Sequence, residues 1–357
     1  MQSKNLARTA VTLDDIAREV GVSKVTVSAV LNRRTSNVRV SDQTRQRIVV
    51  AAREMGYHPN ALARGLTRRR TDTIALVMQS PNVFSGGSGF IAELMHGTVE
   101  TANALGYDLM LHTKDWRDTD RDALALSDGR VDGVLLLRDK DDLLASRLEE
   151  RGLPNVSIFS RPDSVDAWYV DADNLAGGRI AAQYLLALGH RRIGFIGGSD
   201  HSASASDRLQ GFRQEIEEAS VESFRFARVT YAGGDFSEVL HWFSKDIPVT
   251  ERLTALFAWS DDVALRAISL LRDQYGLRVP EEVSVLGFDG TDAVGERSTP
   301  HLSSIRQPIY EIAAAGVQTL AARVSLLSME GAVSPLSRQR LFVPTLLTRD
   351  SCAPFTG

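Results

Sequence analysis

Residues 12–31 read TLDDIAREVGVSKVTVSAVL, and this stretch decides the fold of the N-terminal part of the chain. Thr12, followed three residues later by Asp15, is typical of a helix N-cap. The apolar residues that follow recur at helical spacing and predict a short amphipathic helix: Leu13, Ile16, Ala17 and Val20. Gly21 ends this helix, and Ser23 caps a second one whose inner face comprises Val27, Val30 and Leu31. Two helices joined by a tight turn that contains glycine form a helix-turn-helix.

A third helix is predicted from Ser41 to Gly56, with an inner stripe of Ile48, Ala51, Ala52 and Met55. The three helices make a small bundle. Residues 1–70 carry 14 Lys and Arg against 5 Asp and Glu, a net charge of +9, whereas the rest of the chain carries 27 against 40, a net charge of −13. A basic head on an acidic body indicates that the head, but not the body, meets a polyanion.

The composition excludes several classes of protein. A chain of 357 residues exceeds what one hydrophobic core usually holds, so at least two domains are expected. No apolar run approaches the ~18–20 residues that span a bilayer, and the first residues lack the apolar stretch of a secretory signal. We therefore expect a cytoplasmic protein with no membrane contact. The single cysteine, Cys352, excludes a disulfide framework, and the seven histidines lack metal-ligand spacing, so no metal or cofactor is expected.

From Thr73 onward, apolar strand-like runs alternate with helical patterns. The predicted strands fall into two series: 74–78, 109–112, 131–137 and 156–159, then 193–197, 224–231, 255–259 and 283–288. Helices are predicted near 174–188, 203–219 and 261–274. Buried strands that alternate with helices imply parallel sheets with right-handed crossovers, and two series imply two lobes. A ligand is expected in the cleft between the lobes, at the carboxyl ends of the strands.

Three patterns resemble enzyme sites without supporting catalysis. Ser199, Asp200 and His201 are adjacent, whereas a catalytic triad joins residues from distant positions, so we interpret them as a loop. Residues 86–89 and 194–198 contain glycines but lack the spacing of a dinucleotide or phosphate loop. We interpret His190 as the end of a helix. The chain is therefore not expected to be an enzyme.

The chain resembles the LacI/GalR family of bacterial transcription regulators over nearly its whole length. In the head the resemblance is carried by TLDDIA (12–17), GVS (21–23), TVS (26–28), VLN (30–32), TR (44–45) and GYHPN (56–60). In the body it is carried by LGHRRI (188–193), RLQGF (208–212), SVLGFD (284–289) and the stretch 344–351.

The resemblance implies an α/β fold in which an N-terminal all-α helix-turn-helix head precedes a two-lobed, periplasmic-binding-protein-like body with doubly wound parallel sheets. The implied domains are a DNA-binding head at 1–59, a hinge helix and linker at 60–71, and an effector-binding and dimerisation domain at 72–357. Lobe 1 is expected at about 72–169 and 306–333. Lobe 2 is expected at about 170–305 and 334–357.

A recognition helix offers its first turn to base edges in the major groove. Lys24, Val25 and Thr26 are so placed, with Ser28 and Ala29 farther along. Lys24 suits guanine or a phosphate, and Val25 suits a thymine methyl group. Ala29 departs from the family, which often has Arg there. The DNA-binding residues that the resemblance implies are Thr12, Ser23, Lys24, Val25, Thr26, Ser28, Ala29, Asn32, Asn60, Ala61, Arg64 and Leu66.

Residues 60–66 resemble the family's hinge helix, which enters the minor groove and wedges a leucine between base pairs. Leu66 matches that leucine, Asn60 would cap the helix, and Arg64 would meet phosphate. So short a helix is not stable alone, so we expect it to order only on the operator. A plain interdomain linker is the alternative, and the basic cluster 68–70 suits either.

In the body the resemblance places Arg208 and Asp289 in the cleft, with Asp261 beside them. Carboxylates and a guanidinium form hydrogen bonds with polyol hydroxyls, and an aromatic ring stacks on the C–H face of a sugar. The aromatic candidates are Phe90, Trp168 and Trp259, each of which could equally be a core residue. The chain departs from the family at Ser260, where relatives often have Asn, at Gly290, where many have Asp, and in the inserted loop 86–89.

Together these features imply a homodimeric repressor that binds a pseudo-palindromic operator in double-stranded DNA and responds to a small-molecule effector, for which a sugar is expected. Effector binding would change lobe closure and thereby the hinge helices. Residues 351–357 lack a heptad pattern, so a dimer rather than a tetramer is expected. A nucleobase effector, a phosphocarrier corepressor and a non-regulatory solute-binding protein remain alternatives.

Overall fold

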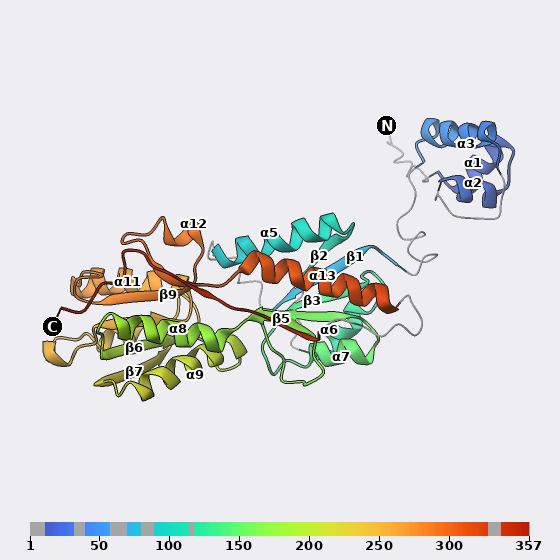
Figure 1. Cartoon of the computed structure of the whole chain (residues 1–357). Helices are drawn as coiled ribbons and strands as arrows, with labels where there is room; N and C mark the ends of the chain where they lie inside the picture. The colour runs from blue at the N-terminus through green and yellow to red at the C-terminus, as the bar shows by residue number, and fades with distance from the viewer. Residues whose placement is uncertain are drawn as a thin grey trace, which may run out of the picture. The chain divides into compact units, whose positions relative to one another are not determined.

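The computed structural model describes residues 11–31, 40–57, 70–79, 89–113, 118–327 and 337–356. The chain divides into two compact units, Met1–Thr71 and Asp72–Gly357 (Figure 1). We refer to them as the head and the body.

The head is a three-helix bundle of α1 (Leu13–Val20), α2 (Lys24–Leu31) and α3 (Asp42–Glu54). Thr12 and Asp15 form the predicted capping box: Thr12 Oγ1 accepts from the Asp15 amide at 3.3 Å, and the Asp15 carboxylate accepts from the Thr12 amide at 3.0 Å. Gly21 ends α1 with a φ of 73°, a left-handed conformation that favours glycine. The bundle core is apolar, and its fully buried members are Ile16, Val27 and Ile48.

The first sheet of the body has the strand order β11-β5-β4-β3-β1-β2 and is parallel throughout. Its strands are β1 (Thr73–Met78), β2 (Asp108–His112), β3 (Gly133–Leu137), β4 (Asn155–Ile158), β5 (Tyr169–Ala172) and β11 (Gln339–Phe342). Its helices are α5 (Gly89–Ala104), α6 (Thr119–Leu126), α7 (Leu144–Glu150) and α13 (Ile309–Leu327). Ile74 and Leu76 pack with α5 and α13, whereas Ala75 and Val77 pack with α6 and α7, so helices cover both faces.

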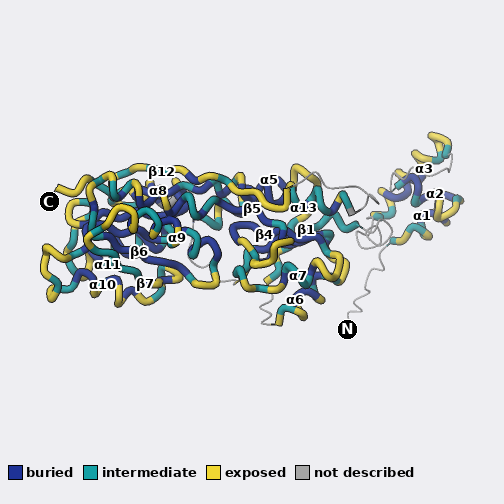
Figure 2. Tube along the Cα trace, turned by 60° about the horizontal axis from the view of Figure 1, so that its bottom comes forward, coloured by how far each residue is buried: buried dark blue, intermediate teal, exposed yellow. Residues whose placement is uncertain are grey.

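The second sheet has the order β12-β10-β9-β8-β6-β7 and is parallel except for the antiparallel β10–β12 pair. Its strands are β6 (Arg192–Gly197), β7 (Ser223–Arg228), β8 (Ala255–Ala258), β9 (Ser284–Asp289), β10 (Ser303–Arg306) and β12 (Thr345–Leu347). Its helices are α8 (Asn174–Ala187), α9 (Ala203–Glu218), α10 (Ser237–His241), α11 (Asp261–Tyr275), α12 (Asp292–Gly295) and the 3₁₀ turn η2 (Val249–Glu251). Figure 2 shows the buried strands within each lobe and the exposed outer surfaces of the helices.

The two lobes are joined by three chain crossings, after β5, after β10 and after β11. The predicted lobe boundaries are wrong in two places, because Val170–Ala172 and Gln339–Phe342 belong to the first sheet rather than to lobe 2. The reason is that β5 and β11 are four-residue strands beside a crossing, and local pattern does not show which sheet a short strand joins.

Helices α8 and α9 meet backbone to backbone. A Cβ on Gly178 would lie 2.1 Å from the Arg208 carbonyl oxygen, and one on Gly211 would lie 2.0 Å from the Leu175 carbonyl oxygen. Only glycine allows this close approach. It fixes the position of α9, which carries Arg208. Among the helices of the described ranges, none is long and apolar enough to cross a bilayer.

Candidate functional site

The predicted residue Arg208 lies at the centre of a buried polar cluster in the body. Its side chain is held on several sides and the residue is only 4% exposed. Its Nε donates to Asn174 Oδ1 at 2.8 Å, and its Nη1 donates to the Trp259 carbonyl at 2.5 Å. Its guanidinium carbon lies 3.5 Å from the centre of the Phe288 ring, which is a cation–π contact. Arg208 is therefore preorganised rather than free to reorient.

Three buried aspartates interact electrostatically with Arg208: Asp171, Asp261 and Asp289. Burial raises the pKa of Asp171 to about 6 and that of Asp289 to about 7, and the positive charge of Arg208 opposes both shifts. Burial and the neighbouring charge of Asp289 raise the pKa of Asp261 well above its usual range. Three carboxyls around one guanidinium carry excess negative charge, so the cluster favours a protonated carboxyl near neutral pH.

The carboxylates are held in place by the surrounding backbone and side chains. Asp261 accepts from Ser304 Oγ at 2.5 Å and from the Gly290 amide at 2.9 Å, at the start of α11. Asp289 ends β9, has a φ of 124°, and accepts from Gln307 Nε2 at 2.8 Å. A non-glycine residue at this φ is strained, which is common where a side chain is positioned for function.

Two buried polar atoms of this cluster have no hydrogen-bond partner among the described residues: Gln307 Oε1 and Thr291 Oγ1. Gln307 is the residue that donates to Asp289, and the amide of Thr291 donates to Asp261 at 3.3 Å. Leaving buried polar atoms unpaired costs free energy, so such atoms call for an explanation such as a bound ligand. The cluster can accept and donate several further hydrogen bonds to a polar molecule.

The three predicted aromatic residues are placed differently. Trp259 lies next to Arg208 through its carbonyl, but its indole N–H donates to the Val229 carbonyl at 2.9 Å and its ring packs into lobe 2. Phe90 packs edge-on against Phe159, with ring centres 4.8 Å apart. The Trp168 ring lies 4.7 Å from the Arg323 guanidinium and against the first-lobe core, so its contacts are not with the Arg208 cluster.

Sequence reasoning missed four residues of the cluster: Asp171, Asn174, Ser204 and Gln307. Asp171 accepts from Ser204 Oγ at 3.2 Å and from Asn174 Nδ2 at 3.1 Å, which joins the end of β5 to the first turns of α8 and α9. Three polar residues at the end of the short strand β5 were an available signal: Asp171, Asp173 and Asn174. No local signal points to Gln307.

An open groove of about 380 Å³ lies elsewhere, between α9 and the edge strand β7. Its lining includes Gln210, Arg213, Phe226 and Arg228. The arginines in it are exposed, whereas the Arg208 cluster is buried and contains one strained residue, Asp289, and two unpaired polar atoms. The Arg208 cluster is therefore the better candidate for specific binding, despite the more open shape of the groove.

The predicted loop at 199–201 and the predicted helix end at His190 both lie outside the Arg208 cluster. Ser199, Asp200 and His201 lie between β6 and α9, outside any helix or strand. His190 follows α8 and is buried, with Nδ1 3.0 Å from Thr254 Oγ1 and Nε2 3.1 Å from Ser284 Oγ. Burial lowers the pKa of His190 to about 4, which keeps it neutral.

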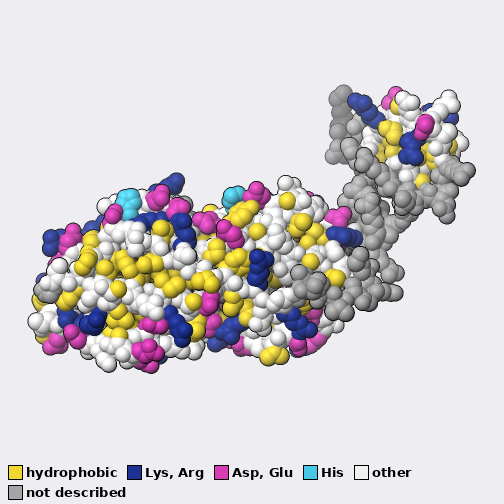
Figure 3. All heavy atoms as spheres, viewed as in Figure 1, with side chains coloured by type: hydrophobic (Ala, Val, Ile, Leu, Met, Phe, Trp, Pro, Cys, Tyr) yellow, Lys and Arg dark blue, Asp and Glu magenta, His cyan; other side chains and the backbone are white. Residues whose placement is uncertain are grey.

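In the head, the first turn of α2 is exposed. Val25 is 64% exposed, and Lys24 Nζ lies 2.7 Å from Asp14 Oδ2. Ser23 Oγ accepts from the Thr26 amide at 3.2 Å, so Ser23 caps α2 as predicted. Figure 3 shows lysine and arginine side chains on the head.

Ala29 does not lie on the exposed face of α2, where a DNA-contacting residue was predicted. It is only 9% exposed, because α2 turns this position toward the bundle, and Ser28 beside it is half-buried. Thr12 caps α1. The remaining predicted DNA-binding residues lie outside the described residues: Asn32, Asn60, Ala61, Arg64 and Leu66.

Comparison with known proteins identifies the family. Residues 12–60 match the model of bacterial regulatory proteins of the lacI family, and residues 182–352 match that of a periplasmic binding protein-like domain. The chain is 36% identical over 302 residues to the HTH-type transcriptional regulator CelR of Thermobifida fusca, which covers 83% of this chain and 87% of CelR. The chain belongs to the lacI family.

Solved structures agree with this lacI-family assignment. A transcriptional regulator CelR–cellobiose complex is 32% identical, covers 96% of this chain and 99% of its own, and has a TM-score of 0.65. A lac repressor dimer bound to operator has a TM-score of 0.80 at 24% identity, with 97% and 100% covered, and supports the fold. The predictions of family, fold class and function are confirmed: the chain is a DNA-binding transcriptional regulator with an effector-binding body, not an enzyme.

Proposed function

We propose that this lacI-family regulator is a homodimeric, cytoplasmic repressor whose effector, a neutral sugar, binds at the Arg208 cluster. The observation that carries the proposal is a buried set of carboxylates and a guanidinium beside the unpaired atoms Gln307 Oε1 and Thr291 Oγ1. Sugar hydroxyls donate to carboxylates and accept from guanidinium, which is the pattern that such a cluster can satisfy.

The charge of the cluster favours a neutral ligand. Asp171, Asp261 and Asp289 outnumber Arg208, so a phosphorylated sugar would meet excess negative charge in a buried site. The Phe288 ring is covered by Arg208, and the Trp259 ring packs within lobe 2. Neither ring is therefore available to stack on a nucleobase. A solved CelR complex that resembles this chain contains cellobiose, which also favours a sugar.

The test is a thermal-shift and calorimetric titration of the full-length protein with cellobiose, ribose, glucose 6-phosphate and hypoxanthine. A neutral sugar should raise the melting temperature and bind with one site per chain, and Arg208→Ala should abolish this binding. Binding of hypoxanthine alone would assign a nucleobase effector. If none binds, the response to a phosphocarrier protein becomes the better hypothesis.

For the DNA, we propose that the heads of a dimer read the two halves of a pseudo-palindromic operator through Lys24 and Val25. The support is that both side chains lie exposed in the first turn of α2, where a recognition helix meets base edges. We further propose that Asn60 to Leu66 form the hinge helix on DNA. Operator selection with Lys24→Ala and Val25→Ala tests the reading face, since each base contact is worth ~1–3 kcal/mol.

A further inference from the structure

The two lobes contact each other through two exposed ion pairs near the start of α9. His201 Nδ1 lies 2.6 Å from Asp141 Oδ2, and the Lys140 amide donates to the His201 carbonyl at 2.9 Å. Arg161 Nη2 lies 2.8 Å from both carboxylate oxygens of Asp207. Asp141 and Arg161 follow β3 and β4 of the first lobe, whereas His201 and Asp207 belong to the second. We call these contacts the interlobe ion pairs.

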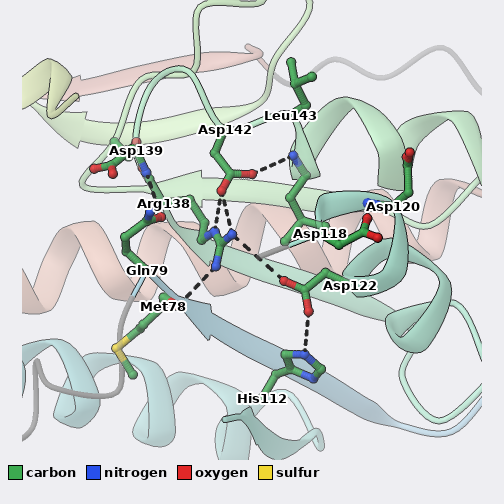
Figure 4. Close-up of polar contacts among 12 residues, drawn as sticks. Met78, Gln79, His112, Asp118, Asp120, Asp122, Arg138, Asp139, Asp142 and Leu143 are labelled. Atoms are coloured by element: carbon green, nitrogen blue, oxygen red, sulfur yellow. Dashed lines mark hydrogen bonds and ion pairs between the residues drawn. The ribbon is translucent and has the colours of Figure 1, made fainter. Parts of the chain in front are cut away.

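On the first lobe, the loop that carries Asp141 is held by a network of largely buried polar side chains. Arg138 Nη2 lies 2.6 Å from Asp142 Oδ2, and Asp142 Oδ1 accepts from the Leu144 amide at 2.8 Å. Behind them, Asp122 lies 3.1 Å from His112 Nε2 and 3.9 Å from Arg138 Nη2, as Figure 4 shows. The side chains of this network are largely buried, so the loop is held on a rigid base.

Two further bonds join this loop to the segment that carries Arg161. The Asp163 amide donates to the Lys140 carbonyl at 3.0 Å, and Ser160 Oγ donates to the Arg138 carbonyl. The first-lobe partners of both interlobe ion pairs therefore form one connected surface. An opening of the lobes would have to break both pairs.

Helix α9 carries both Asp207, a partner in one interlobe ion pair, and Arg208 of the buried cluster. Within α9, Asp207 faces Arg161, Arg208 lies in the cluster, and Ser204 Oγ contacts both the Phe159 carbonyl and Asp171, each at 3.2 Å. Any movement of α9 away from the first lobe would therefore disturb the cluster as well.

We propose that the pairs His201–Asp141 and Arg161–Asp207 hold the lobes in the arrangement described here and so set the affinity for the effector. The inference rests on the proposed function, in which the effector binds at the Arg208 cluster. We call this arrangement, in which both ion pairs are formed, closed. A contact made only in the closed arrangement shifts a two-state equilibrium toward it by its own free energy. Exposed pairs of this kind change such an equilibrium about two- to fivefold each.

The first pair also couples closure to protonation. The charged groups that face His201 are Asp141, Asp139 and Asp200, and the hydrogen bond to Asp141 is the main cause that raises the pKa of His201 above its ordinary 6.5. The same bond lowers the pKa of Asp141. Protonation of His201 therefore favours the closed arrangement, and this contribution is lost as the pH rises through the raised pKa.

The test measures the distance between the lobes in the full-length protein without any ligand. Spin labels are placed at two exposed positions by Leu124→Cys in α6 and Glu238→Cys in α10, in a Cys352→Ser background. Pulsed dipolar spectroscopy then gives the ratio of closed to open molecules. Asp141→Asn and Arg161→Gln should each lower this ratio about two- to fivefold.

Asp128→Asn is the matched control, because Asp128 forms an exposed pair with Arg130 at 2.7 Å within one lobe. An unchanged distance distribution in both Asp141→Asn and Arg161→Gln would overturn the proposal, as would an equal shift in the control. The double variant Asp141→Asn with His201→Gln should open the lobes no further than either single change, because both remove the same pair.

The pH dependence separates His201 from the buried carboxyls. From pH 6 to pH 8 the fraction of closed molecules should fall more steeply in the wild type than in His201→Gln. Any contribution of Asp171 and Asp289 to this pH dependence is common to both proteins. Equal slopes would refute the role of His201.

A cellobiose titration of the same variants is a separate readout. If neither the wild type nor any variant binds cellobiose, the proposed effector is wrong, while the distance measurements still decide the role of the ion pairs.

Discussion

The substitution Asp289→Asn should stabilise the body at alkaline pH while weakening effector binding. Burial raises the pKa of Asp289 from 3.8 to about 7. Between these values the folded protein binds the proton more tightly than the unfolded chain, so the wild type loses stability as the pH rises through this range. A shift of this size corresponds to up to about 4 kcal/mol, at 1.36 kcal/mol per pKa unit.

Asparagine retains most of the local structure. Its Oδ1 can accept from Gln307 Nε2, as the carboxylate does at 2.8 Å, and asparagine tolerates a positive φ better than most residues. Arg208 keeps Asp171 and Asp261 as neighbouring charges. The variant therefore removes the cost of a buried charge without leaving the guanidinium unopposed.

The assay is urea unfolding of wild type and Asp289→Asn at pH 5.5 and pH 8.5. The difference in unfolding free energy, variant minus wild type, should become more positive at the higher pH by about 2 kcal/mol, because the wild type loses stability only from pH 5.5 to about pH 7 within this range. Asp128→Asn, at an exposed aspartate, should change by less than about 0.5 kcal/mol at either pH. A pH-independent difference for Asp289→Asn would refute the reasoning that the buried carboxyl titrates in this range.

Three further predictions concern packing and DNA. Gly178→Ala should destabilise the body by about 1–3 kcal/mol in urea unfolding, although alanine normally favours a helix, because the added Cβ would lie 2.1 Å from the Arg208 carbonyl; an unchanged midpoint would contradict this. Operator affinity measured over a salt series should fall steeply with salt, and Lys24→Ala should flatten the slope only if Lys24 meets phosphate. Leu66→Ala should weaken operator binding and reduce DNA bending in gel mobility, and equal bending by both proteins would leave residues 60–66 as a linker.

Three of the predicted strands are buried on both faces. The apolar runs at 74–78, 133–137 and 255–258 are continuous because helices cover both sides of the sheets, and β1, β3 and β8 lie there. Strand β11 could not be predicted in this way, because it is an edge strand whose residues Gln339 to Leu341 are exposed. Without an apolar run its sequence carries little signal, whereas the edge strands β2 and β7 contain enough apolar residues to be predicted at 109–112 and 224–231.

The family resemblance indicated part of the candidate site. The structure brings the predicted residues Arg208, Asp261 and Asp289 together, whereas Asp171 and Gln307 come from segments next to the chain crossings and become neighbours only in the folded body. Whether a side chain is buried also depends on tertiary packing. Ala29 occupies a recognition-helix position, yet the packing of α2 and not its sequence position decides that it is turned inward.

The chain crossings have a consequence for synthesis on the ribosome. The first lobe begins at Thr73, but its core needs α13, and its sheet gains β11 only at Gln339–Phe342. The second sheet likewise receives β12 only at Thr345–Leu347. Neither lobe is a continuous stretch of chain, so neither can finish folding as it emerges, and both must wait for the same late segment. A nascent or truncated chain that ends before residue 339 would present incomplete edges of both sheets to chaperones and proteases.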